Sequence, residues 1–250
     1  MLFELNNVTF QYEDATPALD GIQGSISAGD RLVILGANGS GKSTLLRILA
    51  GLEFPTTGSV RWDGSELSEK SLRDAAFRAD FRTRVGFVFQ NADAQLFNAT
   101  VQEEVEFGPR QMGLSNTEVA DRSRDILRLL GIQHLAERPP FRLSGGEKRK
   151  VAMASVLSMN PDVILMDEPF LGLDPRSQSW LLKTLSTLGA AGKTTILATH
   201  TLDLVPQVAD RVWVLDETHH LIADGSAAHV LNDSNRLQRA NLTALEQAIA

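Results

Sequence analysis

Short apolar runs alternate along the chain with segments in which apolar residues recur every three or four positions. The runs at 31–35 (RLVIL) and 162–166 (DVILM) are continuously apolar after their first residue, which indicates strands buried on both faces. Runs of the same kind at 194–198 (TTILA) and 211–215 (RVWVL) each adjoin a polar or acidic turn. Buried strands separated by helical segments predict an α/β fold with a largely parallel sheet and helices on its faces.

The first third of the chain has a different pattern. Residues 2–12 and 59–62 have the character of short strands, and the second run is closed by the turn signal Asp63-Gly64. We therefore expect a small antiparallel β subdomain beside the parallel core.

The middle of the chain, between about residues 100 and 140, has helical periodicity. Ser115 and Glu118 have the spacing of a capping box, and Gly131 is a helix stop. These signals predict an inserted helical subdomain. We expect one compound domain over residues 1–250, with the core and β subdomain at about 1–98 and 155–250, the helical subdomain at about 99–154, and a short helical tail ending in TALEQAIA.

Composition narrows the functional classes. The 250 residues contain no Cys, which excludes disulfides, thiolate metal sites and Cys nucleophiles. The chain has 24 Lys and Arg residues and 31 Asp and Glu residues, which gives a net charge of −7. The excess of basic residues typical of proteins that bind nucleic acid nonspecifically is therefore absent. No run of about 18 apolar residues occurs, and Glu4 lies in the first apolar stretch. We expect an unexported, soluble chain that needs another subunit to act across a membrane.

Residues 36–43, GANGSGKS, fit the pattern G-x-x-x-x-G-K-[ST] between the run 31–35 and a helical segment. Such a P-loop bends its main-chain N–H groups around nucleotide phosphates, while its Lys and Ser supply a positive charge and a Mg²⁺ ligand. A Gly-rich turn before an ordinary helix is the alternative, which the order of strand, loop and helix disfavours. The expected nucleotide contacts are Gly36, Ala37, Asn38, Gly39, Ser40, Gly41, Lys42, Ser43 and Thr44, with Ser43 also a metal ligand.

Two acids, Asp167 and Glu168, follow the buried run at 162–166. Because the carboxyl ends of parallel strands meet at one edge of a sheet, we expect Asp167 to face the phosphate loop. Asp167 would then hold Mg²⁺, and Glu168 would orient or deprotonate the water that attacks the γ-phosphate. Without the phosphate loop, a solvated turn would be the preferred interpretation.

The segment LSGGE at 143–147 carries a second capping box, formed by Ser144 and Glu147. Gly145 and Gly146 follow the cap, so a phosphate can approach bare N–H groups at the positive end of a helix. The alternative is a well-capped helix with a solvated basic face.

GANGSGKS, LSGGE, VILMDEP with GLD, and TH at 199–200 together resemble the ATP-binding cassette ATPases over essentially the whole chain. The resemblance implies ATP hydrolysis with ATP and Mg²⁺ as cofactors, and a head-to-tail dimer in which LSGGE of one subunit closes over ATP held by the other. By position, Tyr12 is the expected adenine-stacking residue, and Gln90, at the end of the expected strand 85–90 (VGFVFQ), contacts Mg²⁺ and the water. His200 contacts the γ-phosphate, and Asp174 touches the partner subunit. Taken alone, each of these residues has an ordinary structural interpretation.

Residues 90–97 (QNADAQLF) and the following TVQEEVEFGP narrow the resemblance to the energy-coupling factor type, the ATPases of cobalt, nickel and vitamin uptake systems. Ala92 and Ala94 depart from the more usual Pro and Asp, and Phe170-Leu171 stands where Thr-Ala or Ser-Ala is usual. The resemblance implies a transmembrane coupling subunit, a separate substrate-binding membrane subunit, no nucleic acid, and a peripheral place on the cytoplasmic face of the cell membrane.

Leu96 and Phe97 are apolar residues in an otherwise polar loop. We expect this exposed pair to dock against the transmembrane coupling subunit, with a small satellite core as the alternative.

The sequence leaves the transported solute open, and also whether the chain pairs with itself or with a paralogue. A soluble cassette ATPase that acts on nucleic acid or ribosomes is the alternative function, disfavoured by the single cassette and the net charge of −7. His219-His220 is interpreted as a turn rather than a nickel or cobalt site, because no acid or Cys ligand set surrounds it.

Overall fold

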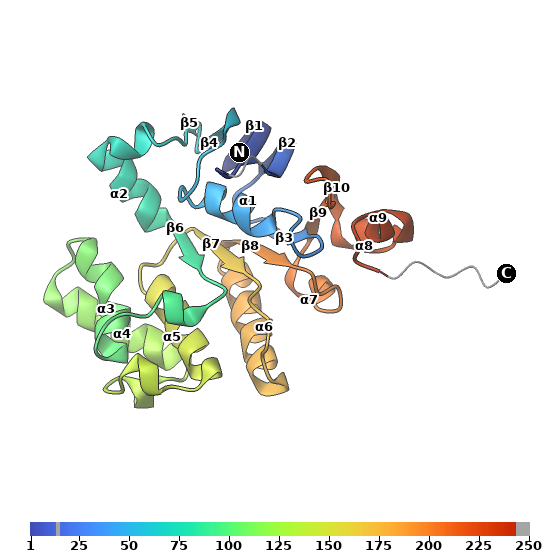
Figure 1. The fold of residues 1–250 in the computed structure, drawn as a ribbon. Coiled ribbons are helices and arrows are strands. Elements are labelled where there is room, and N and C mark those ends of the chain that lie inside the picture. Colours follow the sequence, from blue (N-terminus) through green and yellow to red (C-terminus); the bar gives the residue numbers. More distant parts are fainter. Residues whose placement is uncertain (14–15, 244–250) are drawn as a thin grey trace.

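The computed structural model of the protein describes residues 1–13 and 16–243 and has two sheets with helices around them (Figure 1). The larger sheet has the strand order β10-β9-β3-β8-β7-β6, in which every neighbouring pair is parallel except β10 with β9. Its strands are β3 (Arg31–Leu35), β6 (Val85–Val88), β7 (Val163–Asp167), β8 (Thr194–Thr199), β9 (Arg211–Leu215) and β10 (Leu221–Ser226).

Strand β3 shows why these runs are continuously apolar. It lies between β8 and β9, and its Leu32 and Ile34 enter one hydrophobic core while Val33 and Leu35 enter another. Successive side chains point to opposite faces of a strand, so a sheet covered on both faces needs apolar residues at every position.

The smaller sheet is antiparallel, with the order β2-β1-β4-β5. It lies above the parallel sheet in Figure 1, and α1 packs between them with contacts to β2, β7 and β8. The strands are β1 (Phe3–Gln11), β2 (Pro17–Ile26), β4 (Thr57–Trp62) and β5 (Ser65–Glu66), and the helices outside the inserted subdomain are α1 (Lys42–Leu49), α2 (Ala75–Arg84), α6 (Pro175–Ala190), α7 (Val205–Val208), α8 (Ala227–Leu231) and α9 (Ser234–Arg239).

The inserted helical subdomain comprises α3 (Val101–Gln111), α4 (Asn116–Leu129) and α5 (Gly145–Leu157), which pack against one another. Both predicted capping boxes are confirmed, at Ser115 with Glu118 and at Ser144 with Glu147. Helix α5 is continuous past residue 154, so the expected subdomain boundary falls inside it. Short 3₁₀ turns occupy Ser71–Arg73, Ala92–Ala94, Gln133–Leu135 and Pro140–Arg142.

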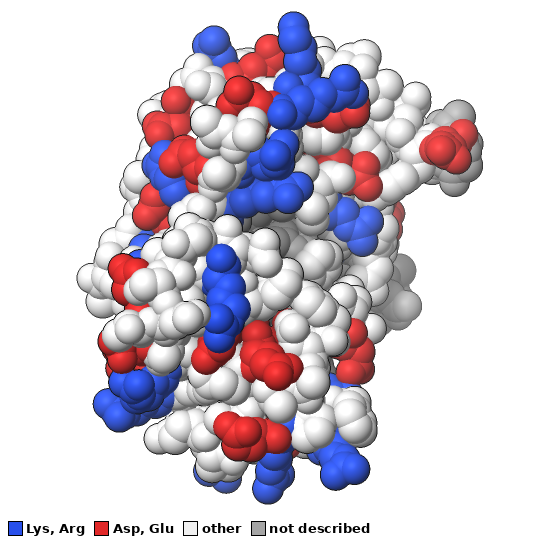
Figure 2. Space-filling model, turned by 90° about the vertical axis from the view of Figure 1, so that its left-hand side faces the viewer, with Lys and Arg blue, Asp and Glu red and all other residues white. Residues whose placement is uncertain are grey.

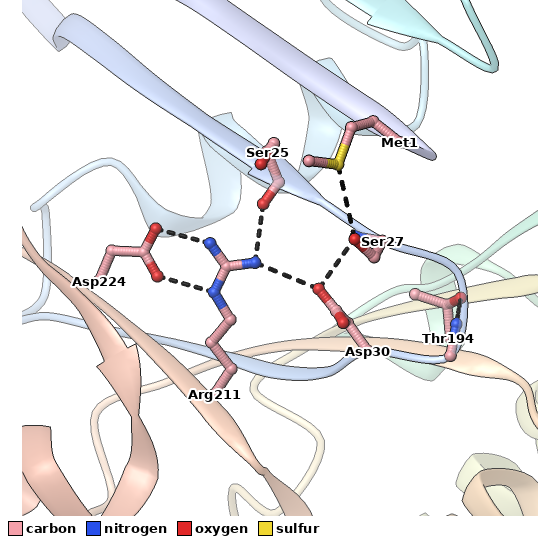
Figure 3. Close-up of polar contacts among 8 residues, drawn as sticks. Met1, Ser25, Ser27, Asp30, Thr194, Arg211 and Asp224 are labelled. Carbon is pink, nitrogen blue, oxygen red and sulfur yellow. Dashed lines mark hydrogen bonds and ion pairs between the residues drawn. The ribbon is translucent and has the colours of Figure 1, made fainter.

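A cluster around Arg211 joins the two sheets (Figure 3). Its guanidinium binds both carboxylate oxygens of Asp224 at 2.7 and 2.6 Å, the main-chain oxygen of Ser25 at 2.8 Å and Asp30 at 3.2 Å. One side chain therefore connects β9 and β10 to the end of β2 and to the turn before β3.

The structure differs from the sequence predictions at the ends of two strands. Strand β7 begins and ends one residue later than expected and includes Asp167. Strand β6 ends at Val88, so Gln90 lies beyond the strand that it was expected to terminate, because the N–H of Phe89 donates to Oε1 of Gln95 at 3.1 Å instead of to another strand. Residues 244–250 of the expected helical tail lie outside the described residues. Within the described part of the chain, no helix combines the length and apolarity needed to cross a membrane.

Candidate functional site

The phosphate loop runs from β3 into α1, and two of its positions require glycine. A Cβ on Gly36 would lie 2.3 Å from Oγ of Ser40, and one on Gly41 would lie 2.1 Å from the main-chain oxygen of Ala18. Gly41 also has a φ of 101°, which side-chain-bearing residues rarely adopt. Since no side chain caps α1, the N–H groups of its first turn are available to an anion.

Lys42 is folded back over this loop. Its ammonium donates to the main-chain oxygens of Gly36 at 2.8 Å and Ala37 at 2.9 Å, and lies 4.0 Å from Oε1 of Glu168. Burial lowers the pKa of Lys42, and the charges of Glu168 and Asp167 oppose this shift. The loop thus holds a buried positive charge close to where phosphates would bind.

Asp167 closes β7 directly opposite the phosphate loop. The hydroxyl of Ser43 donates to Oδ1 of Asp167 at 3.0 Å. Burial raises the pKa of Asp167, the hydrogen bond from Ser43 lowers it, and the charge of Glu168 raises it further. The edge of the sheet therefore brings together two hard oxygen donors contributed by β7 and α1.

Glu168, the next residue, is buried and held from two sides. Its Oε2 accepts a hydrogen bond from Oγ1 of Thr199 at 3.0 Å, and its Oε1 lies 2.8 Å from Nδ1 of His200. Glu168 has a φ of 43°, the left-handed region that is uncommon for residues other than glycine. The chain therefore holds this carboxylate in a strained backbone conformation beside Lys42.

Lys42, Ser43 and Glu168 line one cavity of about 400 Å³, whereas Asp167 and His200 are not among its lining residues. Tyr12 lies on its wall, 40% exposed, and its hydroxyl is 3.0 Å from Oγ1 of Thr44. Its ring meets that of Phe10 edge to face at 4.9 Å. The lining comprises Tyr12, Thr16, Pro17, Ala18, Asn38, Gly39, Gly41, Lys42, Ser43, Thr44, Gln90, Glu168 and His219.

The segment LSGGE does not contribute to this cavity. Ser144, Gly146 and Glu147 line a different cavity together with Asp174. Hydrogen bonds from the Ser144 hydroxyl and main chain lower the pKa of Glu147, and those from Ser177 lower the pKa of Asp174. A Cβ on Gly145 would meet no atom within 4 Å, so this turn is open to an approaching group. The expected nucleotide contacts thus divide into two separate half-sites.

Several residues at and around this site were not predicted from the sequence, among them Thr16, Pro17 and Ala18 on the cavity wall. Thr199 holds Glu168, Gln95 bonds the segment after Gln90 to α5, and Arg149 reaches the main chain beyond Glu168. His219 lines the cavity beside Lys42 although the sequence around it indicated only a turn. His220 pairs with Asp20 at 3.3 Å, and no group of three or more His, Asp or Glu that could hold a metal ion occurs among residues 1–13 and 16–243.

Comparison with known proteins places the chain in a family. Residues 19–171 match the family model described as ABC transporter. The chain belongs to this family. It is an ATPase, and the predicted resemblance to ATP-binding cassettes of the energy-coupling factor type is confirmed, as is the predicted cassette fold.

The most informative relatives extend over nearly the whole chain. A putative ABC transporter ATP-binding protein of Caldanaerobacter subterraneus is 48% identical over 96% of this chain and 98% of its own length. The nickel import ATP-binding protein LarO of Lactiplantibacillus plantarum is 43% identical over 98% of this chain and 100% of its own. The energy-coupling factor transporter ATP-binding protein EcfA of Methanosphaera stadtmanae is 43% identical over 96% of this chain and 85% of its own.

Two solved structures share the fold. The protein cbiO1 from Clostridium perfringens, part of the ABC transporter complex cbiONQ, superposes with a TM-score of 0.81 at 36% identity over 96% of this chain and 94% of its own. The cassette MJ0796, in a dimeric post-hydrolysis state bound to ADP and Pi, superposes with a TM-score of 0.80. It is 29% identical over 90% of this chain and 99% of its own.

Proposed function

We propose that this chain is the ATP-hydrolysing subunit of an energy-coupling factor type importer for a metal ion or a vitamin. It would act at the cytoplasmic face of the cell membrane, with a second cassette, a transmembrane coupling subunit and a substrate-binding membrane subunit. The observation that carries this proposal is the full-length similarity to LarO and EcfA, named for nickel import and for an energy-coupling factor transporter. A soluble cassette acting on nucleic acid or ribosomes has no support in these comparisons.

The oxygen donors at the sheet edge fit Mg²⁺. Ligands at about 2.1 Å in octahedral geometry lie about 3 Å apart, and the oxygens of Ser43 and Asp167 are 3.0 Å apart. Gln90, which lines the same cavity, supplies a third oxygen. When bound, the ion would neutralise charge on the β- and γ-phosphates.

In this proposed function, the residues around the 400 Å³ cavity have separate roles in ATP hydrolysis. Tyr12 stacks on adenine, and the loop N–H groups with Lys42 hold the phosphates. Glu168 takes a proton from a water as the water oxygen attacks the γ-phosphorus and ADP leaves. Thr199 and His200 hold the Glu168 carboxylate, and His200 would also contact the γ-phosphate.

The division into two half-sites supports a head-to-tail dimer. Neither cavity alone contains both the phosphate loop and the LSGGE turn, so each ATP would lie between the loop of one subunit and Ser144, Gly145 and Gly146 of the other. Asp174 lines the same half-site and would meet the partner.

A mixing experiment tests this arrangement. Lys42→Ala disables the phosphate loop of its own chain, and Gly145→Asp blocks only the turn offered to the partner. Each variant alone should be inactive, whereas a mixed dimer contains one intact site. Random pairing in an equal mixture should restore about a quarter of wild-type activity. A mixture as inactive as its components would contradict a site shared between chains.

The surface for the membrane subunit lies between α2 and α3. The expected exposed pair is wrong in one member, because Leu96 packs against the main core while Phe97 is 66% exposed and rests edge to face on Phe107 at 5.0 Å. Figure 2 shows Lys and Arg gathered on the upper part of this face. Helix α2 carries Arg78 and Arg82 in its sequence. A groove lined by Arg82, Gln95, Phe97, Glu104 and Phe107 is the surface that we assign to the coupling subunit.

The solute class is tested by reconstitution. The chain should copurify with membrane subunits encoded beside it, and proteoliposomes containing the complex should take up labelled nickel, cobalt or a vitamin when ATP is enclosed on the side of this chain. Uptake of none of these solutes by an assembled, ATP-hydrolysing complex would contradict the proposed importer class. Stoichiometric copurification with nucleic acid would favour the alternative function.

A further inference from the structure

Arg149 lies in the second turn of α5, the helix that begins at the LSGGE turn. Its Nη1 donates to the main-chain oxygens of Pro169 at 2.8 Å and Leu171 at 3.0 Å, and its Nη2 donates to that of Gln90 at 3.0 Å. One guanidinium therefore gathers three carbonyl groups.

These carbonyls belong to the two segments that carry the proposed chemistry. Gln90 lies just beyond β6, while Pro169 and Leu171 follow Glu168 beyond β7. The strands β6 and β7 are parallel neighbours, with Val88 opposite Met166, so both segments leave the same edge of the sheet. Arg149 reaches both from a helix of the other subdomain.

Arg149 binds main-chain oxygens rather than a carboxylate. Among the residues that the structure describes, no Asp or Glu lies within ion-pair distance of it, and burial lowers its pKa. The preceding residue is different, because Lys148 forms an ordinary ion pair with Asp93 at 2.6 Å. A planar guanidinium holds its N–H donors in fixed directions on separate nitrogens, one of which can serve each chain segment, whereas all donors of an ammonium lie on one nitrogen.

The helix is attached to the two segments unequally. Three side chains connect α5 to residues 90–95. Lys148 pairs with Asp93, and Arg149 donates to the main-chain oxygen of Gln90. Gln95 forms hydrogen bonds to Ala152 and Ser155 of the helix. Hydrogen bonds from α5 to the residues that follow Glu168 come from Arg149 alone in the described chain. Loss of Arg149 would therefore detach α5 from the residues that follow Glu168 (the Glu168 segment). Residues 90–95 would stay attached to α5.

We propose that Arg149 is a positioning residue that makes the placement of Glu168 and Gln90 depend on the position of the LSGGE helix. When α5 moves against a partner's nucleotide, the same side chain carries that movement to the main chain on either side of the water-activating site. A displacement of about 1 Å at a reacting group is worth about 10² in rate, so a single tether of this kind can make hydrolysis conditional on docking. The inference rests on the proposed roles of Glu168 and Gln90.

The test compares Arg149→Met with Lys148→Met, which removes a charge one residue away but does not touch the Glu168 segment. We expect Arg149→Met to lower kcat about 10- to 100-fold, with ATP affinity within about threefold because the phosphate loop is untouched. The kcat of Arg149→Lys should lie between that of Arg149→Met and that of the wild type. The kcat of Lys148→Met should stay within about twofold of the wild-type value. All assays are run at one common temperature, about 15 °C below the lowest melting temperature among the variants, so that unfolding does not contribute.

A double-mutant cycle separates positioning from a general structural effect. If Arg149 acts through Glu168, adding Arg149→Met to Glu168→Gln should lower the residual rate by no more than about twofold. Wild-type kcat in Arg149→Met, an equal loss in Lys148→Met, or full multiplication of the two effects would overturn the inference. Wild-type turnover by Glu168→Gln alone would instead remove the proposed role of Glu168, without involving Arg149.

Discussion

Replacing Glu168 by Gln separates the chemical role of the carboxylate from its structural role. In the folded chain its two oxygens contact Oγ1 of Thr199 at 3.0 Å and Nδ1 of His200 at 2.8 Å. The Gln amide has the same shape but one acceptor oxygen, so at most one of these contacts is lost. At roughly 0.5 to 1.5 kcal/mol for that contact, the variant should melt about 1 to 6 °C lower.

The expected loss in turnover is larger than this structural cost. Gln has no basic lone pair for the proton of the attacking water, and removal of a general base lowers rates by about 10² or more, which corresponds to about 2.7 kcal/mol of activation free energy. ATP affinity should stay within about threefold, because Lys42 is held by the loop carbonyls of Gly36 and Ala37 and lies 4.0 Å from Glu168. The variant should therefore accumulate as an ATP-bound dimer.

Phosphate release at saturating ATP and Mg²⁺, with a thermal melt of each protein, measures both quantities. Thr199→Val is the matched control, since it removes a hydrogen bond to the same carboxylate and keeps the base. It should melt about as low as Glu168→Gln and retain turnover within about fivefold. More than about a tenth of wild-type turnover in folded Glu168→Gln would refute the assignment of Glu168 as the general base.

Three further substitutions test other parts of the molecule. Tyr12→Phe should bind ATP normally, whereas Tyr12→Ala should lose about 1 to 3 kcal/mol of binding free energy, and equal affinities measured by titration would exclude stacking. Phe97→Ala should leave the ATPase rate of the isolated chain within about threefold of the wild-type rate, because the side chain is 66% exposed. It should abolish solute uptake by the reconstituted complex, and persistent uptake by an assembled complex would exclude Phe97 as a coupling contact. Arg211→Ala leaves Asp224 and Asp30 without their partner and should cost about 2 kcal/mol of unfolding free energy, or about 4 to 8 °C; Arg73→Ala, which breaks a pair with side chains 76% and 70% exposed, is its control and should shift the melt by less than about 2 °C.

Local sequence signals located the elements of the core with little error. The run at 31–35 forms β3 residue for residue, because a strand buried on both faces tolerates no polar interruption. The capping boxes at Ser115 and Ser144 were predictable from spacing alone, since their hydrogen bonds lie within four residues. The phosphate loop and the two acids at the end of β7 were predictable because each motif lies at the carboxyl end of a buried strand.

The contacts that join distant segments could not be predicted in this way. Arg149 and Gln95 bind main-chain oxygens, which every residue carries, so no residue pairing in the sequence marks their partners. The same reason hides the bond from Phe89 to Gln95 that ends β6 before Gln90. Leu96 illustrates a different limit, because whether an apolar loop residue is exposed depends on the helix that packs over it.

The left-handed backbone at Glu168 has a consequence for laboratory evolution. With a φ of 43°, this position is one that Gly or Asn adopts with less strain than Glu. A library screened for heat resistance alone should therefore enrich such replacements at position 168, since they relieve strain and a buried carboxylate at the same time. Those variants would have a higher melting temperature but would not hydrolyse ATP. Any programme to stabilise this protein therefore needs ATP turnover as a second selection criterion at each round.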